Sequence, residues 1–236
     1  MRGKVVLVTG ATGGIGSALV PWLAEQGCQL VLAARRAEQL AVLVNQTAQQ
    51  TSVIGIPTDV SQFSQAEALV SQAYNQFGRI DILINAAGQG VLKPLSQLTP
   101  TDLEKLLDVN LKGSFYTSQL VSNLMREQKS GHILNFPGIL GRYPMAMAAA
   151  YCASKFGVVG FSKCMADELK RFGVKVTLFY FGGIDSPFWD SISMKVQRDK
   201  MLKLDTALQA IQFALTVPEE AIPSEVVLQP ESHQFL

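Results

Sequence analysis

The sequence contains few of the residues that build metal centres and disulfide frameworks. Its 236 residues include three cysteines, Cys28, Cys152 and Cys164, and two histidines, His132 and His233. The number of cysteines is odd and no two of them form a CxxC pair, so the pattern supports neither a disulfide framework nor a zinc site. We therefore expect no metal at the functional site and a reducing, cytoplasmic compartment.

Charge of either sign is also scarce. Charged residues make up 17% of the chain, against roughly 25% in a typical soluble protein, and the formal net charge is +1. A nearly neutral chain lacks a strongly basic surface, so we expect no nucleic-acid partner. An apolar content of 48% is too high for a disordered chain. Because the apolar runs are short, we expect neither a membrane span nor a signal peptide.

Short apolar runs alternate with longer amphipathic stretches along the chain. The runs are nearly continuous in apolar residues, which is typical of parallel strands covered on both faces. We expect strands at 5–8, 30–33, 53–56, 80–84, 133–136, 174–179 and 226–228. We expect helices at 14–26, 37–49, 65–77, 101–128 (one or two helices), 149–172 and 206–216. The alternation predicts an α/β fold of Rossmann type, a doubly wound parallel sheet of about seven strands with helices on both faces.

The chain shows no linker, internal repeat or low-complexity tract. At roughly 150 residues per domain its length allows one large domain, and we expect a single domain over residues 1–236. The one irregular stretch is 182–203, which contains Pro187 and Trp189. A long segment of this kind predicts a substrate lid rather than a domain boundary.

A glycine-rich loop, Thr9-Gly10-Ala11-Thr12-Gly13-Gly14-Ile15-Gly16, connects the first expected strand to the first expected helix. Its spacing is GxxxGxG, where GxGxxG is commoner. Glycines let the backbone approach a ligand closely, and the free N–H groups of the following helix attract a pyrophosphate. The context therefore predicts dinucleotide binding rather than a plain turn. The residues expected to bind are Gly10, Thr12, Gly13, Gly14, Ile15 and Gly16.

Two arginines, Arg35 and Arg36, follow the second expected strand, and no acidic residue stands there. An acid at this position of a dinucleotide fold holds the ribose hydroxyls, whereas an arginine accommodates a 2′-phosphate. A guanidinium can bind that phosphate through two hydrogen bonds. We therefore predict NADP(H) in preference to NAD(H), with Arg35 the principal contact and Arg36 the second. The alternative is that both arginines only solvate the next helix.

Tyr151 and Lys155 lie four residues apart in the expected helix 149–172, so they share one face of it. A free tyrosine has a pKa of about 10, and a nearby ammonium lowers it. Such a tyrosine is a suitable general acid for a carbonyl oxygen that receives a hydride at its carbon. Taken alone, the Tyr-x-x-x-Lys spacing is a weak signal, because many such pairs arise by chance on helix surfaces.

Taken with the glycine loop, the pair carries a resemblance. Over residues 3–230 the chain resembles the short-chain dehydrogenase/reductase (SDR) family. The matching motifs are the loop Thr9 to Gly16, Asp59-Val60, Asn85-Ala86-Ala87-Gly88, Asn110, Tyr151 and Lys155. The resemblance implies a seven-stranded Rossmann sheet, NAD(P)-dependent carbonyl–alcohol chemistry, and a homodimer or homotetramer built on the helices at 101–128 and 149–172.

The resemblance also implies a role for each matched residue. Asp59 and Val60 would flank the adenine, although Asp59 is equally suited to cap a helix. Asn110 would hold a water in a proton relay, and Lys155 would bond the nicotinamide ribose. The residues expected to line the rest of the cofactor site are Asn85, Ala86, Ala87, Gly88, Tyr151, Gly182, Ile184 and Ser186. Ser186 stands where the family has a threonine, and Phe181 where it has a proline.

One family residue is missing. The catalytic serine stands about thirteen residues before the tyrosine, and Gly138 holds that position here, after Pro137. Loss of such a donor costs on the order of 10²–10³ in turnover. One alternative is an NADP(H)-dependent oxidoreductase in which a water or a substrate hydroxyl replaces the serine. The other is an NADP(H)-binding protein with little or no catalysis, acting as a cofactor sensor or interaction protein. A third alternative is that Gly138 is an engineered or natural variant at the position of the family's serine.

The expected substrate wall is apolar and aromatic. It consists of Ile139, Leu140, Tyr143, Pro144 and Met145, together with Phe188 and Trp189 from the lid. This composition predicts a carbonyl or secondary-alcohol substrate with apolar bulk rather than a small charged acid. The alternative is that Met145 and Met147 begin a helix and only pack.

Overall fold

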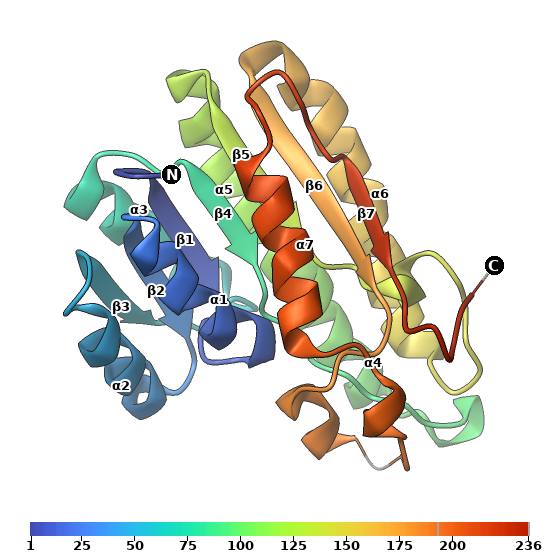
Figure 1. Ribbon diagram of the computed structural model, residues 1–236. Coiled ribbons are helices and arrows are strands. Elements are labelled where there is room, and N and C mark those ends of the chain that lie inside the picture. Colours follow the sequence, from blue (N-terminus) through green and yellow to red (C-terminus); the bar gives the residue numbers. More distant parts are fainter. Residues whose placement is uncertain (193, 236) are drawn as a thin grey trace.

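A computed structural model describes residues 1–192 and 194–235, and its core is one parallel sheet. The strands are β1 (Val5–Thr9), β2 (Gln29–Ala34), β3 (Val53–Pro57), β4 (Ile82–Asn85), β5 (Gly131–Asn135), β6 (Val174–Phe181) and β7 (Glu225–Leu228). They lie in the order β3-β2-β1-β4-β5-β6-β7 (Figure 1). The strands from β1 to β3 extend the sheet to one side and those from β4 to β7 extend it to the other, so the strand order reverses between β1 and β4. This is the predicted Rossmann-type, doubly wound sheet.

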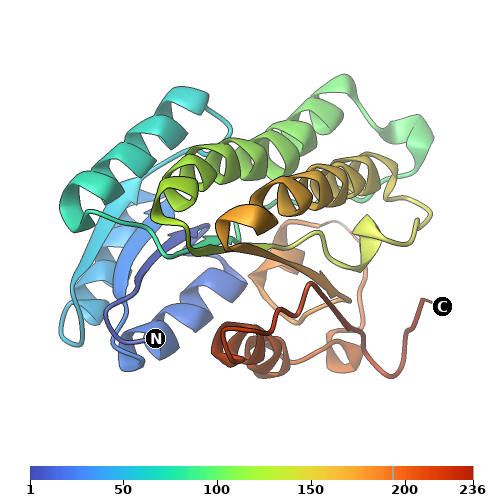
Figure 2. The ribbon, with the colours of Figure 1, turned by 90° about the horizontal axis from the view of Figure 1, so that it is seen from above.

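Helices cover both faces of the sheet. They are α1 (Gly14–Glu25), α2 (Ala37–Thr47), α3 (Phe63–Phe77), α4 (Pro100–Leu106), α5 (Gly113–Gln128), α6 (Ala149–Leu169) and α7 (Leu204–Thr216). Figure 2 shows α3, α5 and α6 above the sheet, with α1 and α7 below it. Within β1, Val6 and Val8 pack in the α1–α7 core, whereas Val5 and Leu7 pack in the α3–α5–α6 core. Its first four residues, Val5 to Val8, are all apolar because both faces of the strand are buried.

Several boundaries differ from those expected. The fourth strand begins at Ile82 rather than at residue 80, because the backbone of Ile80 bonds the Gln128 side chain instead of a neighbouring strand. The Ile80 N–H donates to the Gln128 Oε1 at 3.1 Å, and the Gln128 Nε2 donates to the Ile80 carbonyl at 2.9 Å. The helical stretch 101–128 is split by a π-helical turn, Leu107–Lys112. Met147 has a φ of 67° and α6 begins at Ala149, so the interpretation that Met145 and Met147 start a helix is wrong.

The 182–203 segment leaves the sheet after β6 and returns to it before α7. Its two ends are tied together, since the Asp185 N–H donates to the Leu202 carbonyl and the Leu202 N–H to the Gly183 carbonyl, both at 2.9 Å. Between them lie the 3-10 helices Pro187–Ser191 and Arg198–Lys200. Among the described residues, no helix is both long enough and apolar enough to cross a bilayer.

Candidate active site

A cleft of about 1460 Å³ opens at the carboxyl ends of the strands, where this fold places its ligands. Nearly all the predicted cofactor residues line it. These are Gly10, Thr12, Gly13, Gly14, Ile15, Arg35, Arg36, Asp59, Val60, Asn85, Ala86, Ala87, Gly88, Tyr151, Lys155, Gly182, Ile184 and Ser186. Gly138 lines it too. Two predicted residues, Gly16 and Asn110, lie behind its wall.

The glycine loop passes against neighbouring backbone. Gly10 has a φ of +65°, and a Cβ there would lie 2.6 Å from the Ala87 amide nitrogen. A Cβ on Gly16 would lie 2.4 Å from the Gly10 carbonyl oxygen, so Gly16 allows α1 to pack on the loop. The prediction that Gly16 contacts the cofactor is not supported by its position, because its absent side chain serves this packing.

The first turn of α1 is suited to an anion. Its N-cap residue, Gly13, offers no side-chain cap, and no acidic residue stands in the first turn. The leading N–H groups and the positive end of the helix dipole are therefore not neutralised by the helix's own side chains. Ser186 lies close by, since a Cβ on Gly14 would be 2.9 Å from the Ser186 Cβ. The loop, α1 and the segment after β6 together form the cradle that a pyrophosphate requires.

Arg35 and Arg36 are exposed at the end of the cleft beside β2. Within residues 1–192 and 194–235, neither of them takes part in an ion pair. Asp59 lines the same end, and its Oδ1 accepts from the Ser61 N–H at 3.0 Å and from the Ser61 hydroxyl at 2.7 Å. The N-cap residue of α3 is Gln62, so the interpretation of Asp59 as a helix cap is wrong. The guanidinium groups remain available to an anionic ligand.

Tyr151 lies in the first turn of α6, and Lys155 lies one turn further along. The Lys155 Nζ donates to the Phe136 carbonyl at 2.8 Å and sits 5.7 Å from the centre of the Tyr151 ring. Burial lowers the pKa of Lys155 to about 8. Burial also raises the pKa of Tyr151 well above its usual range. The expected lowering of the tyrosine pKa by the ammonium is thus opposed by removal of the phenol from water, which raises that pKa.

Asn110 is fully buried in the π-helical turn, and its side chain positions other groups. Its Nδ2 donates to the Gln89 carbonyl and to the Ser154 Oγ, both at 3.0 Å, and its Oδ1 accepts from the Gln89 N–H at 2.8 Å. Both amide hydrogens are therefore used within the protein. Asn110 fixes the loop after β4 and, through Ser154, the helix that carries Tyr151. Its side-chain amide has no hydrogen left for the expected relay water.

Gly138 has a φ of +67° and a ψ of 175°, a region of backbone space that is essentially restricted to glycine. A Cβ there would meet only the Phe181 carbonyl oxygen, at 3.5 Å. Its N–H donates to the Phe179 carbonyl at 3.1 Å, and its own carbonyl accepts from Gly141 at 3.0 Å. Space is thus available for a serine side chain, but the backbone conformation opposes one.

A buried polar network supports the cleft from behind, and only one of its members was predicted as a site residue. Asn85 Nδ2 donates to the Asn135 Oδ1 at 2.8 Å and to the Ser118 Oγ at 2.9 Å. Thr117 Oγ1 donates to the Asn85 Oδ1 at 2.7 Å, and Asn135 Nδ2 to the Ser162 Oγ at 2.8 Å. The network joins β4 and β5 to α5 and α6. Strand pairing brings these residues together, so no single stretch of sequence signals them.

The far end of the cleft combines apolar side chains with polar and charged lid residues such as Asp190, Lys195 and Lys200. Five of the predicted wall residues line it, namely Ile139, Leu140, Met145, Phe188 and Trp189. Tyr143 and Pro144 do not, so their assignment to the wall is wrong. The Tyr143 ring instead stacks on Phe235, with ring centres 5.9 Å apart and planes at 13°. Four C-terminal residues that the sequence did not point to also line the cleft: Pro230, Ser232, His233 and Phe235.

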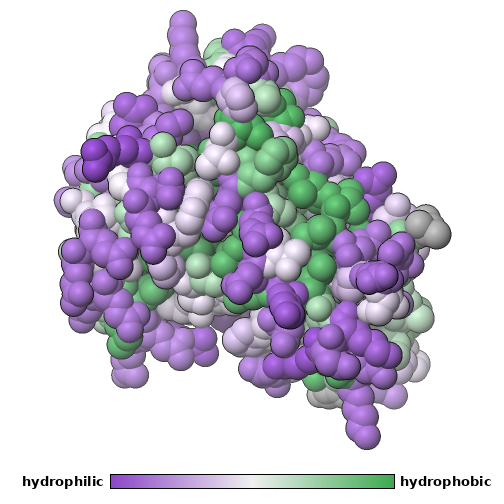
Figure 3. Space-filling model, in the orientation of Figure 1, coloured by the Kyte–Doolittle hydropathy of each residue, from purple (hydrophilic) through white to green (hydrophobic). Residues whose placement is uncertain are grey.

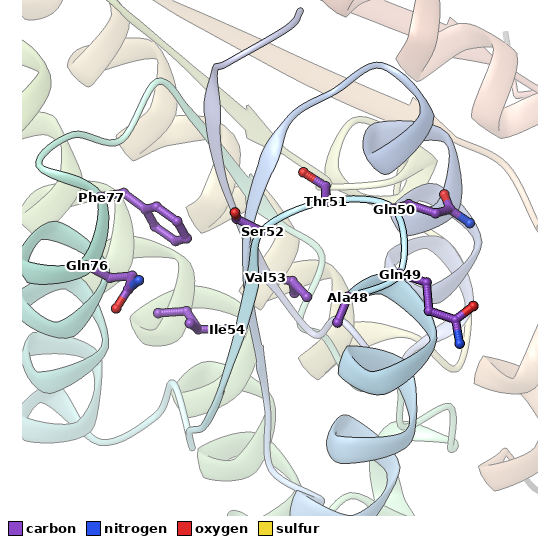
Figure 4. A pocket seen from close by; sticks show the side chains of 9 residues that line it. All are labelled: Ala48, Gln49, Gln50, Thr51, Ser52, Val53, Ile54, Gln76 and Phe77. Atoms are coloured by element: carbon purple, nitrogen blue, oxygen red, sulfur yellow. The ribbon is translucent and has the colours of Figure 1, made fainter.

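A second hollow, of about 510 Å³, lies beside β3 between the ends of α2 and α3 (Figure 4). Its lining is Ala48, Gln49, Gln50, Thr51, Ser52, Val53, Ile54, Gln76 and Phe77. None of these side chains is ionisable, so the hollow offers no general acid or base, and nothing in its lining would activate the Thr51 or Ser52 hydroxyl as a nucleophile. Among the described residues no group of three or more His, Cys, Asp or Glu side chains is arranged to hold a metal.

Comparison with known proteins gives the family. The model of the short chain dehydrogenases matches residues 4–197. An uncharacterised oxidoreductase of Staphylococcus saprophyticus is 35% identical over 244 residues, covering 100% of this chain and 99% of its own. A similar oxidoreductase of Staphylococcus aureus is 35% identical over 227 residues, covering 96% of this chain and 97% of its own. The chain therefore belongs to the short-chain dehydrogenase family, as the motifs predicted.

Solved structures agree with the fold. A metagenomic short-chain oxidoreductase in complex with NADP superimposes with a TM-score of 0.82 at 29% identity, covering 97% of each chain. An alcohol dehydrogenase of the archaeon Thermococcus sibiricus, in complex with 5-hydroxy-NADP, has a TM-score of 0.90 over 100% of both chains. At 23% identity the second comparison supports the fold alone. The single Rossmann-type domain with helices on both faces is thereby confirmed.

Proposed function

We propose that the protein is an NADP(H)-dependent oxidoreductase that transfers hydride between the nicotinamide and a carbonyl or secondary-alcohol substrate. The observation that carries the proposal is that Tyr151 and Lys155 line the same cleft as the glycine loop. A proton donor and a dinucleotide cradle in one cavity are the two parts that a carbonyl reductase needs. The family's oxidoreductase relatives support it.

The residues of the cleft fit NADP(H). Uncapped N–H groups at the start of α1 suit the pyrophosphate, and Arg35 and Arg36 suit a 2′-phosphate at the adenosine end. The metagenomic neighbour was solved in complex with NADP, which supports a nicotinamide cofactor, whereas the proposed preference for NADP(H) over NAD(H) rests on the two arginines. When bound, the reduced cofactor supplies the hydride.

Tyr151 supplies the proton in the direction of reduction. Because burial raises the pKa of its phenol, Tyr151 holds its proton at neutral pH and can donate it from Oη to a substrate oxygen. The Lys155 ammonium then stabilises the phenolate that is left, since it lies 5.7 Å from the ring centre. In the reverse direction, alcohol oxidation, the tyrosine would have to begin deprotonated and accept the proton.

The alternative function is NADP(H) binding with little or no catalysis, as a cofactor sensor or interaction protein. Gly138 is the observation that favours it, because glycine gives the substrate oxygen no side-chain donor. The reductase account instead assigns that donor to a water or to a hydroxyl of the substrate. We favour the reductase because Asn110, Tyr151 and Lys155 are all present and connected through Ser154 and α6.

The apolar end of the cleft supports a substrate with apolar bulk, held between the 139–145 loop and the 182–203 lid. We further propose a homodimer or homotetramer in the cytoplasm. Phe115 and Phe156, on α5 and α6, are 41% and 44% exposed, and such an apolar surface is expected at an interface. A second hydrophobic strip lies near β7 and α7 (Figure 3), where Phe213 is exposed. The described cysteines are unpaired, which suits a reducing compartment.

The test of the proposed function compares the wild type with Tyr151→Phe. We expect the variant to reduce carbonyls about 10²- to 10⁴-fold more slowly, because a general acid accelerates the reaction by that factor. Its affinity for NADPH should change little, since only the hydroxyl is removed. Equal reduction rates in both proteins would contradict the role of Tyr151. Cofactor binding without reduction of any ketone, aldehyde or quinone by the wild type would favour the alternative function.

A further inference from the structure

The C-terminal segment, residues 230–235, folds back over the substrate end of the cleft. Residues 231–234 are exposed, whereas Pro230 is buried and Phe235 is partly buried. The Gln229 side chain closes the segment into a loop. Its Oε1 accepts from the Phe235 N–H at 2.8 Å, and its Nε2 donates to the Phe235 carbonyl at 3.1 Å. The segment therefore has a defined path that brings Phe235 to the cleft.

Phe235 is held by an aromatic stack. Its ring stacks on Tyr143, and His233 meets it edge-on at 5.2 Å between ring centres. The Arg142 guanidinium also lies over the Tyr143 ring, 5.8 Å from its centre. Arg142 is anchored in turn by the Glu225 carboxylate of β7, at 3.4 Å. Offset aromatic pairs of this kind stabilise a fixed arrangement.

The segment also contacts the lid. The Ser232 hydroxyl donates to the Lys200 carbonyl at 2.9 Å, which ties the C-terminal segment to the second 3-10 helix of 182–203. Pro230 packs on Gly182, where a Cβ would lie 2.6 Å from the Pro230 Cδ. The segment thus bridges the two walls of the cleft, the loop after β5 and the lid after β6.

The apolar packing of Phe235 reaches the proposed catalytic tyrosine through one shared residue. Phe235 and Leu140 both pack against the buried cluster of Ile139, Leu178 and Tyr180. Leu140 also packs against a second buried cluster, as do Tyr151 and Phe188. Tyr151 and Phe235 thus line one cleft and are linked through the apolar side chain of Leu140.

We infer that Pro230, Ser232, His233 and Phe235 form the wall that sets the size of the substrate, with Phe235 as the specificity-determining residue. The inference rests on the proposed function, because it concerns the substrate of the same cleft. In this arrangement Tyr143 acts from outside the cleft, as the surface on which Phe235 is docked. Carbonyl compounds with compact apolar bulk fit inside the wall, and longer ones collide with the Phe235 ring.

The experiment compares Phe235→Ala with the wild type on a series of methyl ketones of increasing alkyl length. We expect the ratio of kcat/KM for the longest ketone to that for the shortest to rise about tenfold or more in the variant, because steric exclusion from an apolar pocket has effects of this size. NADPH affinity should stay within about twofold, since the cofactor groups are untouched. Gln234→Ala is the matched control, because Gln234 is exposed and does not line the cleft. Phe235→Tyr should keep the wild-type ratio.

A binding measurement keeps the test independent of turnover. Trp189 lines the same end of the cleft, so quenching of its fluorescence reports the binding of a long-chain aryl ketone to the NADPH-loaded protein. Tighter binding by Phe235→Ala with unchanged binding by Gln234→Ala supports the wall. Equal affinities, or an unchanged kcat/KM ratio in a folded variant, overturn it. If the wild type binds ketones without reducing them, the proposed function is contradicted. The inference about the wall is then tested by the ketone affinities from fluorescence quenching alone.

Discussion

The Lys155 ammonium lies 5.7 Å from the centre of the Tyr151 ring and donates its hydrogen bond to the Phe136 carbonyl oxygen, 2.8 Å away. Phe136 directly follows β5, so the carboxyl end of a central strand holds the lysine in place. The lysine thus provides a positive charge beside the phenol without competing for its hydroxyl. That arrangement suits a tyrosine that begins the reaction protonated and ends it as a stabilised phenolate.

The rate of carbonyl reduction should fall as the pH rises through about 8. Burial lowers the pKa of Lys155 to about 8, so its charge is present below that pH and is lost above it. Without the ammonium, the phenolate formed at Tyr151 has no nearby cation. A profile of kcat/KM against pH between about 6 and 10 measures this. A rate that stays constant to the alkaline limit would show that the Lys155 charge does not contribute.

Arg35→Ala should weaken NADPH binding about 10- to 100-fold and leave NADH binding nearly unchanged. The reason is that loss of charge-assisted hydrogen bonds to a phosphate costs roughly 1.5–3 kcal/mol, and NADH lacks that phosphate. Fluorescence titration with both cofactors provides the measurement, and Arg36→Ala should show a smaller effect in the same direction. Equal losses for the two cofactors would refute the preference for NADP(H).

Gly138→Ser should lower stability even though its side chain has room. Because the backbone lies in a region that only glycine adopts readily, we expect serine and alanine at this position each to cost about 1–3 kcal/mol. Thermal denaturation measures the loss. If turnover is limited by the missing hydroxyl donor, Gly138→Ser should reduce carbonyls faster than Gly138→Ala. Identical rates in the two variants would mean that the hydroxyl is not the limiting feature.

The folded state should lose stability as the pH falls from about 6.5 to about 4. Burial, with Lys175 and Lys4 nearby, lowers the pKa of His132 to about 4, and its Nε2 lies 2.7 Å from the Thr177 Oγ1. The unfolded chain therefore binds more protons in this interval, and protonation favours unfolding by up to roughly 3 kcal/mol. Urea denaturation at several pH values should show this slope in the wild type and in His233→Gln but not in His132→Gln.

The strand pattern was predictable because each central strand is buried on both faces and is therefore mostly apolar, as Val5 to Val8 of β1 are. The glycine loop and the pair of arginines were predictable because their chemistry is local. Tyr143 was misplaced, and Phe235 missed, because the stack between them joins residues 92 positions apart. The raised pKa of Tyr151 was missed for a similar reason, since burial depends on the packing of Phe188 and the lid rather than on Lys155.

The most direct test of the central claim is a fluorescence titration with NADPH and with NADH, followed in the same cuvette by ketones, aldehydes and quinones. The account predicts tight NADPH binding, weaker NADH binding, and oxidation of bound NADPH by at least one carbonyl compound with apolar bulk. Tight binding with no oxidation across the whole panel would contradict the reductase and leave a cofactor-binding protein.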